Sequence, residues 1–283
     1  MSYSDGNDSD GNDSFSSALD SLPLNICFPL RKEEINSLEK RMDRIVFIQQ
    51  ADTTYHRALK EIKDQESISL LVEPSFYGRH QTTSVLVVAT FNETYIFDIL
   101  ALASIFPELA KILEADQPRK VVHYSHRIAD HLLHRQRISL GGIFDTFVAL
   151  CLERHERLPF SLSEAISFVF NLSMDEILCE EVTGASESRR NFTARPLTHS
   201  QMRYMAKMVQ LQHLMHHRLN YSDIFCAEVH RISLAFSHSY YGLLSCDVAI
   251  NMAPASRFGF QLIDSSFYKS ADEEIEERTI STE

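Results

Sequence analysis

Three short apolar runs, which follow one another between residues 67 and 102, constrain the fold of this chain most strongly. They read SISLLVEPSF, TTSVLVVATFN and ETYIFDILAL, and they are rich in β-branched and aromatic residues. Runs of this composition and length are typical of strands. Their connections are only a few residues long, whereas a parallel crossover needs about a dozen residues or more. The sequence therefore predicts an antiparallel meander of three strands.

Strand and helix patterns alternate around this meander. RIVFIQ at 44–49 predicts a further strand, followed by a helix in which Tyr55, Leu59 and Ile62 recur at helical spacing. KVVHYS and GGIFDT predict two more strands, each leading into a helical run. The later pattern is helical, and the longest amphipathic run follows Pro196. We expect an α/β fold with a mixed central sheet flanked by helices and an extra helical region toward the C-terminus.

The two ends of the chain differ from its middle in composition. Residues 1–22 form a tail of Ser, Asp, Asn and Gly, and residues 269–283 form a second, acidic tail. Neither can bury enough apolar surface to offset the loss of chain entropy, so both are predicted to be disordered. The folded domain is expected at 40–222. Residues 223–268 are rich in aromatics and are expected to pack on that domain or to form an interface.

Most of the net charge of −12 lies in these tails. Residues 1–22 carry five Asp and no Lys or Arg, and residues 271–283 carry six acidic residues and one Arg. Without them the chain is close to neutral, so no overall basic field attracts nucleic acid. The longest apolar runs are far shorter than the roughly 20 residues of a membrane helix, and the first residues lack the features of a secretory signal. We expect a cytoplasmic protein without a membrane partner.

Four sequence motifs follow one another along the chain. They are LLVEPSF at 70–76, VLVVAT followed by YIFDILAL at 95–102, KVVHYSHRIADHLL at 120–133 with IFDT at 143–146, and RPLTHSQMRYMAKMV at 195–209. Together they resemble the DEDD superfamily of 3′-to-5′ exonucleases. More narrowly, they are similar to the ribonuclease D branch that includes Egalitarian and the exonuclease-domain proteins of the piRNA pathway. The resemblance covers roughly residues 44–220 and implies a ribonuclease H-like exonuclease fold.

Enzymes of this family use two metal ions held by four acidic residues, and Mg²⁺ prefers carboxylate oxygen ligands. The positions that match the four acids hold Glu73, Ser75, Ile128 and Met208. Only Glu73 keeps a carboxylate, because a hydroxyl, a hydrocarbon and a thioether are poor replacements for it. Tyr204, which orients the attacking water in active relatives, is retained. The resemblance thus implies a degenerate site with no catalysis, no bound metal and no cofactor.

A residual 3′-to-5′ exoribonuclease is the alternative, in which Glu73, Asp130 and Asp145 form an improvised Mg²⁺ site. Each acid also has a structural interpretation. Asp130 lies about 200° of helical rotation from Ile128, so it is expected to face away from the site. Asp145 is expected to cap the helix that follows it. Glu73 is expected to be a buried carboxylate bonded to the backbone or to Tyr204.

Five basic side chains near the expected cleft are candidates for contacts with RNA phosphates or bases. They are His123, His126, Arg127, Arg203 and Lys207. His123 also matches a position where the family has a structural histidine, which is the competing interpretation of that residue.

Two pairs of potential metal ligands stand four residues apart in helical segments, His213 with His217 and Cys226 with His230. Such spacing places both side chains of a pair on one helix face. Two ligands do not make a zinc site, and the histidine pair lacks the Glu of an H-E-x-x-H motif. We therefore expect the histidine pair to lie on a solvated helix face.

The resemblance implies an RNA-binding adaptor or scaffold in a ribonucleoprotein complex of RNA silencing, of the piRNA type, or of mRNA transport. It further implies RNA and protein partners in that complex, homodimers, and germline ribonucleoprotein granules. The near-neutral middle of the chain predicts that RNA binding is weak or depends on the complex. A scaffold that contacts only proteins is a second hypothesis, which the near-neutral core and the acidic tails favour.

Overall fold

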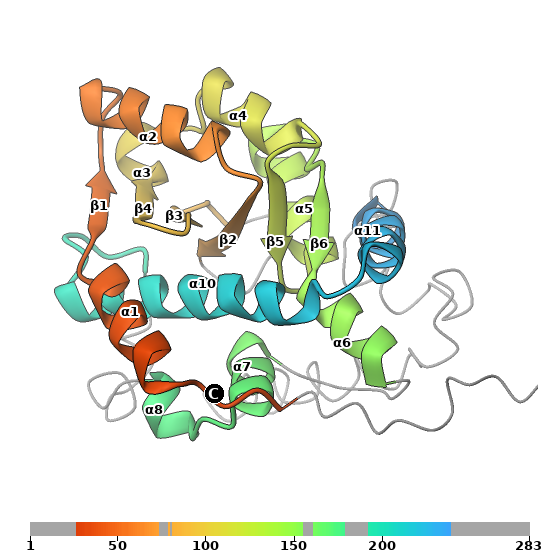
Figure 1. Cartoon of the computed structure of the whole chain (residues 1–283). Helices are drawn as coiled ribbons and strands as arrows, with labels where there is room; N and C mark the ends of the chain where they lie inside the picture. Colours follow the sequence, from red (N-terminus) through yellow and green to blue (C-terminus); the bar gives the residue numbers. More distant parts are fainter. Residues whose placement is uncertain (1–26, 74–78, 80, 155–160, 179–191, 239–283) are drawn as a thin grey trace, which may run out of the picture.

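The computed structural model describes residues 27–73, 79, 81–154, 161–178 and 192–238. These residues form one six-stranded mixed sheet with helices on both of its faces (Figure 1). The two predicted acidic tails and residues 239–268 lie outside the described residues.

The sheet contains all the strands that the sequence predicts. They are β1 (Ile45–Ile48), β2 (Ser67–Glu73), β3 (Val85–Ala89), β4 (Thr94–Asp98), β5 (Arg119–Val122) and β6 (Ile143–Asp145), in the order β1-β4-β3-β2-β5-β6. The pairs β2–β3 and β3–β4 are antiparallel, which confirms the predicted meander. The pairs β1–β4, β2–β5 and β5–β6 are parallel, so the sheet is mixed.

The structure describes ten helices, which lie before, between and after the strands. They are α1 (Lys32–Met42), α2 (Thr53–Lys63), α3 (Ile99–Leu102), α4 (Pro107–Glu114), α5 (Ser125–Gln136), α6 (Thr146–Arg154), α7 (Leu162–Phe170), α8 (Met174–Leu178), α10 (His199–Leu219) and α11 (Asp223–His238). Asp52 is the N-cap of α2, and its carboxylate accepts hydrogen bonds from two backbone N–H groups of the first turn.

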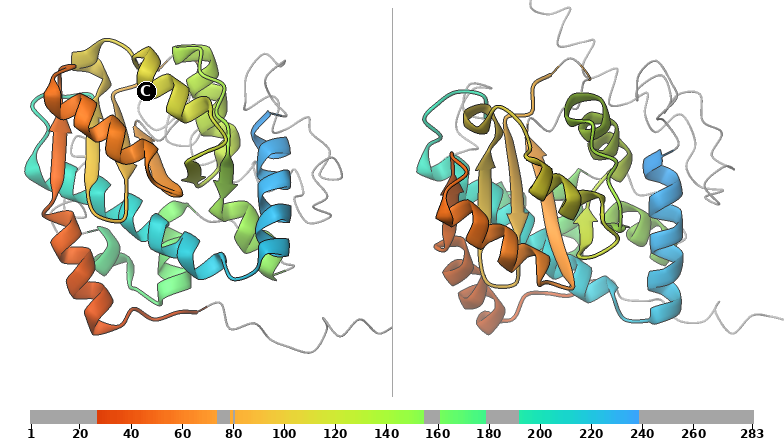
Figure 2. Two further views of the ribbon diagram at one scale, coloured as in Figure 1. Left: turned by 45° about the horizontal axis from the view of Figure 1, so that its top comes forward. Right: turned by 90° about the horizontal axis from the view of Figure 1, so that it is seen from above.

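Two apolar cores sandwich the sheet, because successive strand residues point to opposite faces. Leu70 and Val72 of β2 join α2, α4 and α5 on one face, while Leu71 joins α10, α1 and α7 on the other. Figure 2 shows α2 and α4 in front of the sheet and α10 behind it in the right-hand view. Gln212 anchors α10 to the sheet, since its amide donates to the carbonyl oxygens of Leu70 and Val121 at 3.1 and 2.8 Å.

Helices beyond the expected limits of the domain belong to the same packed unit. The α1 helix buries Leu38 and Met42 in the core beneath α10, so the unit starts before residue 40, where the sequence predicted its beginning. At the other end, α11 packs on α5 and β6. The first part of the predicted 223–268 extension therefore covers the domain.

The α11 helix covers the edge of the sheet that β6 forms. The backbone N–H of Lys120 in β5 donates to the carbonyl oxygen of Gly142. In this parallel register the backbone groups of Ile143 and Asp145 therefore point away from β5. The α11 helix satisfies both residues: His230 Nδ1 lies 2.9 Å from the Ile143 carbonyl oxygen, and the Asp145 N–H donates to Ser233 Oγ at 3.0 Å. An edge strand with satisfied backbone groups does not recruit another strand.

None of the described helices is long and apolar enough to span a membrane.

Candidate functional site

Glu73 ends β2 on the face of the sheet that α10 covers. It pairs with Val85, which in turn pairs with Asp98, so the three residues form one row across β2, β3 and β4. Glu73 is only 3 % exposed, which confirms the predicted burial of its carboxylate. Ser75, the second position of the same motif, lies outside the described residues.

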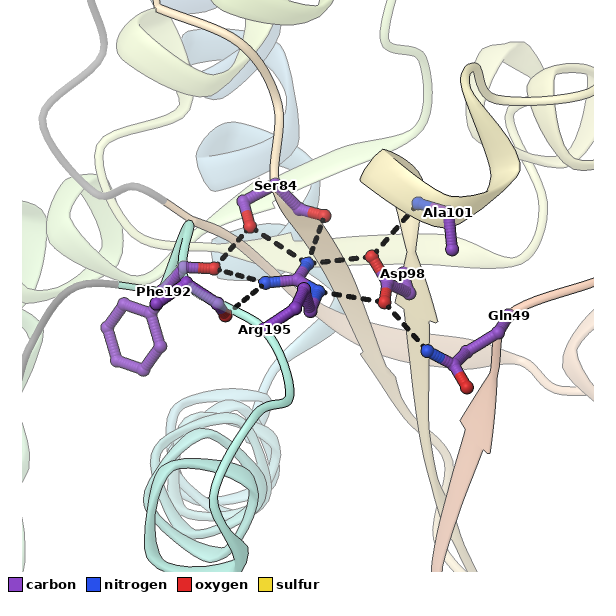
Figure 3. Close-up of polar contacts among 7 residues, drawn as sticks. Gln49, Ser84, Asp98, Ala101, Phe192 and Arg195 are labelled. Atoms are coloured by element: carbon purple, nitrogen blue, oxygen red, sulfur yellow. Dashed lines mark hydrogen bonds and ion pairs between the residues drawn. The ribbon is translucent and has the colours of Figure 1, made fainter.

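An ion pair at the end of this row fixes the chain segment that enters α10 (Figure 3). Arg195 donates to both carboxylate oxygens of Asp98, at 2.8 and 2.7 Å. Its remaining N–H groups bond to the Phe192 and Ala194 carbonyl oxygens at 2.7 and 2.9 Å and to Ser84. The guanidinium thus joins three separate segments of the chain.

The Asp98 side chain is 1 % exposed, and its charge is stabilised within the fold. Burial alone would raise its pKa, but hydrogen bonds from Arg195 and from Gln49, at 3.2 Å, bring the pKa below its usual value. Sequence reasoning missed this pair. Asp98 lies in the YIFD motif and Arg195 in the RPLT motif, and both motifs carry the family resemblance. Their occurrence in these two motifs was the signal from which the pair could have been predicted.

Two of the four positions that match metal-binding acids lie in apolar surroundings. Met208 of α10 is 3 % exposed and belongs to the core between α10 and the sheet. Ile128 of α5 is 2 % exposed and belongs to the core on the opposite face. Tyr204 is half-buried and stacks on Phe192, with 6.2 Å between ring centroids.

Asp145 serves as a backbone cap, as the sequence predicts. Its carboxylate accepts N–H groups of Ser125 at 2.6 Å, Phe147 at 2.9 Å and Tyr124 at 3.2 Å, so it holds the first turns of both α5 and α6. Complete burial raises the pKa of this carboxyl, which the same hydrogen bonds and the nearby His123 oppose.

Asp130 is engaged in an ion pair. Arg79 contacts its carboxylate through Nη2 at 2.6 Å and through Nε at 3.1 and 3.2 Å, and His134 lies 3.5 Å away. The side chain of Asp130 is 1 % exposed. Among the described residues, no three His, Cys, Asp or Glu side chains converge in a way that could hold a metal ion. This donor set does not fit a pair of Mg²⁺ ions, because hard cations need several converging oxygen ligands.

The two candidate RNA-binding histidines are buried. His123 Nδ1 lies 2.9 Å from Thr146 Oγ1, which fits the structural interpretation of that residue. His126 is 0 % exposed and packs against Phe236 of α11, with 4.3 Å between ring centroids. The prediction that His126 could touch RNA is therefore wrong, because α11 covers it. Burial, with Arg127 and His123 nearby, lowers the pKa of His126 well below its usual value.

The three remaining basic candidates contact three different parts of the domain. Arg127 is half-buried, with its guanidinium carbon 5.7 Å from the centre of the Tyr124 ring. Arg203 pairs with Asp43, which follows α1. Lys207 donates to the backbone carbonyl of Glu176 in α8. The structure thus gives each of them a separate local partner.

The predicted solvated helix face is wrong for His213 of the His213–His217 pair, and the neighbouring His216 is buried as well. His213 and His216 are 2 % and 4 % exposed, whereas His217 is exposed. Their helix crosses the whole sheet, and His216 packs edge-on against Phe144 of β6 at 4.5 Å between ring centroids. Cys226 is buried as well, and His230 bonds to the edge of β6.

These two buried histidines give folding a pH dependence. Burial, with His217 nearby, lowers the pKa of His213 and of His216 to about 3 from an ordinary value of 6.5. Below pH 6.5 the unfolded chain binds protons that the folded chain excludes, so stability is full above this pH and is lost as the pH falls. Each histidine contributes a slope of up to about 1.4 kcal/mol per pH unit. Urea unfolding at a series of pH values measures the slope.

The doubly substituted variant His213→Gln/His216→Gln is the control for this prediction. Its slope between about pH 6 and about pH 5, where few carboxylates titrate, should be smaller than that of the natural chain. A slope that is identical in both proteins would contradict the assignment to these two rings.

The chain is similar to proteins named Exd1 and Egalitarian. It is 74% identical over 271 residues to a Drosophila melanogaster protein described as "Protein Exd1 homolog". That alignment covers 96% of this chain and 99% of the relative. It is 29% identical over 142 residues to "piRNA biogenesis protein EXD1" of Bombyx mori, and the alignment covers 47% of this chain and 45% of the relative. An "Egalitarian protein homolog" of Caenorhabditis elegans is 35% identical over 124 residues, 41% and 21% of the two chains. No family model matches the chain.

The fold matches solved exonuclease structures. Trypanosoma brucei RNase D in complex with RNA U12 superposes with a TM-score of 0.58 and 16% identity, covering 73% of this chain and 74% of that chain. Brucella melitensis NrnC with bound Mg²⁺ gives a TM-score of 0.51 and 18% identity, covering 69% and 89%. At these identities the likeness concerns the fold, and the near-full-length identity to the Drosophila protein concerns the family. The chain belongs to the Exd1 family, and its domain has a 3′-to-5′ exonuclease-like fold.

Proposed function

We propose that this domain is a catalytically inactive exonuclease-like domain that serves as an RNA-binding adaptor or scaffold in a ribonucleoprotein complex. The complex would be one of RNA silencing, of the piRNA type, or of mRNA transport. The observation that carries the proposal is the burial of Ile128 and Met208 in apolar cores, at two positions where the family places carboxylates.

The remaining acids support the loss of metal-dependent chemistry. Asp145 is occupied by three backbone N–H groups, and Asp130 by the guanidinium of Arg79. Either acid would have to give up these bonds before it could bind a cation. Leaving such partners unsatisfied in a buried environment costs about 1–3 kcal/mol per group.

RNA as the ligand is supported by the relatives. One is described as a piRNA biogenesis protein, another as an Egalitarian homologue, and an RNase D of the same fold was solved with RNA. Residues 27–238 are close to neutral in net charge, so we expect weak binding through few phosphates. Arg127 is the best remaining candidate contact, because His126 is buried and Arg203 has an acidic partner.

Titration of a labelled single-stranded oligouridine with the full chain tests RNA binding. Two or three phosphate contacts predict that the affinity falls about tenfold between roughly 50 and 200 mM salt. Arg127→Glu should weaken binding further at the lower salt concentration. Arg57→Glu, the same charge change on the exposed side of α2, is the matched control and should have little effect.

The protein-only scaffold is the second candidate function, and the acidic tails favour it. Binding that is absent, or that does not respond to salt or to Arg127→Glu, would exclude phosphate contacts by this domain and leave the protein-only scaffold.

A further inference from the structure

A shallow groove of about 440 Å³ lies between α2 and α4, on the face of the sheet opposite α10. Its floor is apolar and includes Leu59 and Ile112, each 7 % exposed. Its rim carries Lys60 and Lys63 from α2 and Lys111 from α4. Glu73 and Met208 lie on the α10 face, and none of the candidate site residues lines this groove.

The three rim lysines are exposed, and none forms an ion pair with a residue that the structure describes. Glu108 is the acidic residue on the same rim, so the groove has an excess of positive charge. That excess is unusual in a domain whose overall charge is close to neutral. Clustered like charges repel one another, and a bound anion would relieve the repulsion.

The combination of rim and floor selects a particular kind of ligand. A nucleic-acid backbone would use the lysines but would leave the hydrocarbon floor exposed. A peptide in which acidic residues flank an apolar one would use both, because its side chain covers Leu59 and Ile112 while its carboxylates meet the lysines.

The chain itself carries such a segment. Residues 272–277 read DEEIEE, in which five acids surround Ile275. The five Asp residues of the N-terminal tail are single acids, none adjacent to another, so they offer a less dense charge to the groove than 272–277 does. The described structure ends at His238, and the 33 residues from 239 to 271 would span roughly 30 Å as a flexible coil, enough to reach across a domain of this size.

We propose that the groove between α2 and α4 binds the acidic segment 272–277 of the same chain, with Ile275 over the apolar floor. Docking would place the C-terminal acidic segment on the face of the sheet opposite Glu73 and Met208. It would also neutralise the lysines, which makes the interaction sensitive to salt, since exposed charges are screened.

Carbodiimide cross-linking of the full chain, followed by mass spectrometry of the monomer band, tests the proposal. This reagent joins carboxylates to amines that are in direct contact. We expect cross-links from 272–277 to Lys60, Lys63 and Lys111 to exceed those to the exposed Lys32 and Lys40 of α1. High salt and Ile275→Ser should each reduce their yield by at least about threefold.

Charge reversal provides the matched comparison. Lys60→Glu/Lys63→Glu should abolish cross-links to the groove, including those to Lys111, whereas Lys32→Glu/Lys40→Glu changes the net charge equally and should leave them intact. Equal yields at all exposed lysines, or no cross-links, would overturn the proposal. Cross-links confined to the dimer band would assign the groove to a second copy instead. Protection of the three lysines by single-stranded RNA, without tail cross-links, would assign it to nucleic acid.

Discussion

Replacing Arg195 by Ala is expected to lower the free energy of unfolding by about 3–5 kcal/mol, the usual cost of removing one partner of a buried ion pair. The carboxylate of Asp98, 1 % exposed, would lose two charge-assisted hydrogen bonds and keep its burial. The Phe192 and Ser84 carbonyl oxygens would lose donors as well. Since the pair fixes the segment that enters α10, the loss should spread to the helix. Urea unfolding followed by circular dichroism measures the change.

Arg203→Ala is the matched control for this prediction. Arg203 also pairs with an aspartate, but the side chains of Arg203 and Asp43 are 37 % and 65 % exposed. Exposed pairs contribute about 0–1 kcal/mol, so the variant should unfold almost as the natural chain does. Equal effects of the two substitutions would show that the Asp98 pair is not a structural brace.

Phe236→Ala is expected to cost about 3–5 kcal/mol, as large-to-small substitutions of buried aromatic residues do. Phe236 is 0 % exposed and packs against His126 and Phe147, so it attaches α11 to α5 and α6. Its removal should admit water to His126. The pKa of His126, which burial holds well below its usual value, should then rise toward that value. Urea unfolding measures the stability, and proton NMR of the imidazole measures the pKa.

Ile224→Ala tests the same helix without touching the core. Ile224 is 84 % exposed, so its truncation should change stability by less than about 0.5 kcal/mol and leave His126 unprotonated near neutral pH. If Phe236→Ala leaves both the stability and the His126 pKa unchanged, α11 does not cover the domain in solution.

The strands were predictable because their patterns are local. Each of the runs from RIVFIQ to GGIFDT combines β-branched residues with clear boundaries, and short connections imply antiparallel pairing. The α1 helix was not predicted, because Leu38 and Met42 are its only buried apolar residues and its remaining sequence, apart from Ile35, is polar. A pattern with so few apolar residues can be recognised as a core-facing helix only when the position of α10 is known.

The candidate site was predictable in its motif positions and less so in its surroundings. The burial of Glu73 and the capping role of Asp145 followed from residue type and place in the chain. The burial of His126, His213 and His216 did not, because a histidine looks polar in any local pattern. It depends on distant segments, since α11 covers His126 and the sheet lies against α10.

A nuclease assay tests whether the domain lacks metal-dependent exonuclease activity, as we propose. The full chain and the Glu73→Gln variant are incubated with 5′-labelled single-stranded RNA in the presence of Mg²⁺ or Mn²⁺. We expect the RNA to stay intact with both proteins and both metals, because two of the four carboxylate positions hold hydrocarbon and thioether side chains within the core. Shortening from the 3′ end that requires the metal and disappears with Glu73→Gln would contradict it.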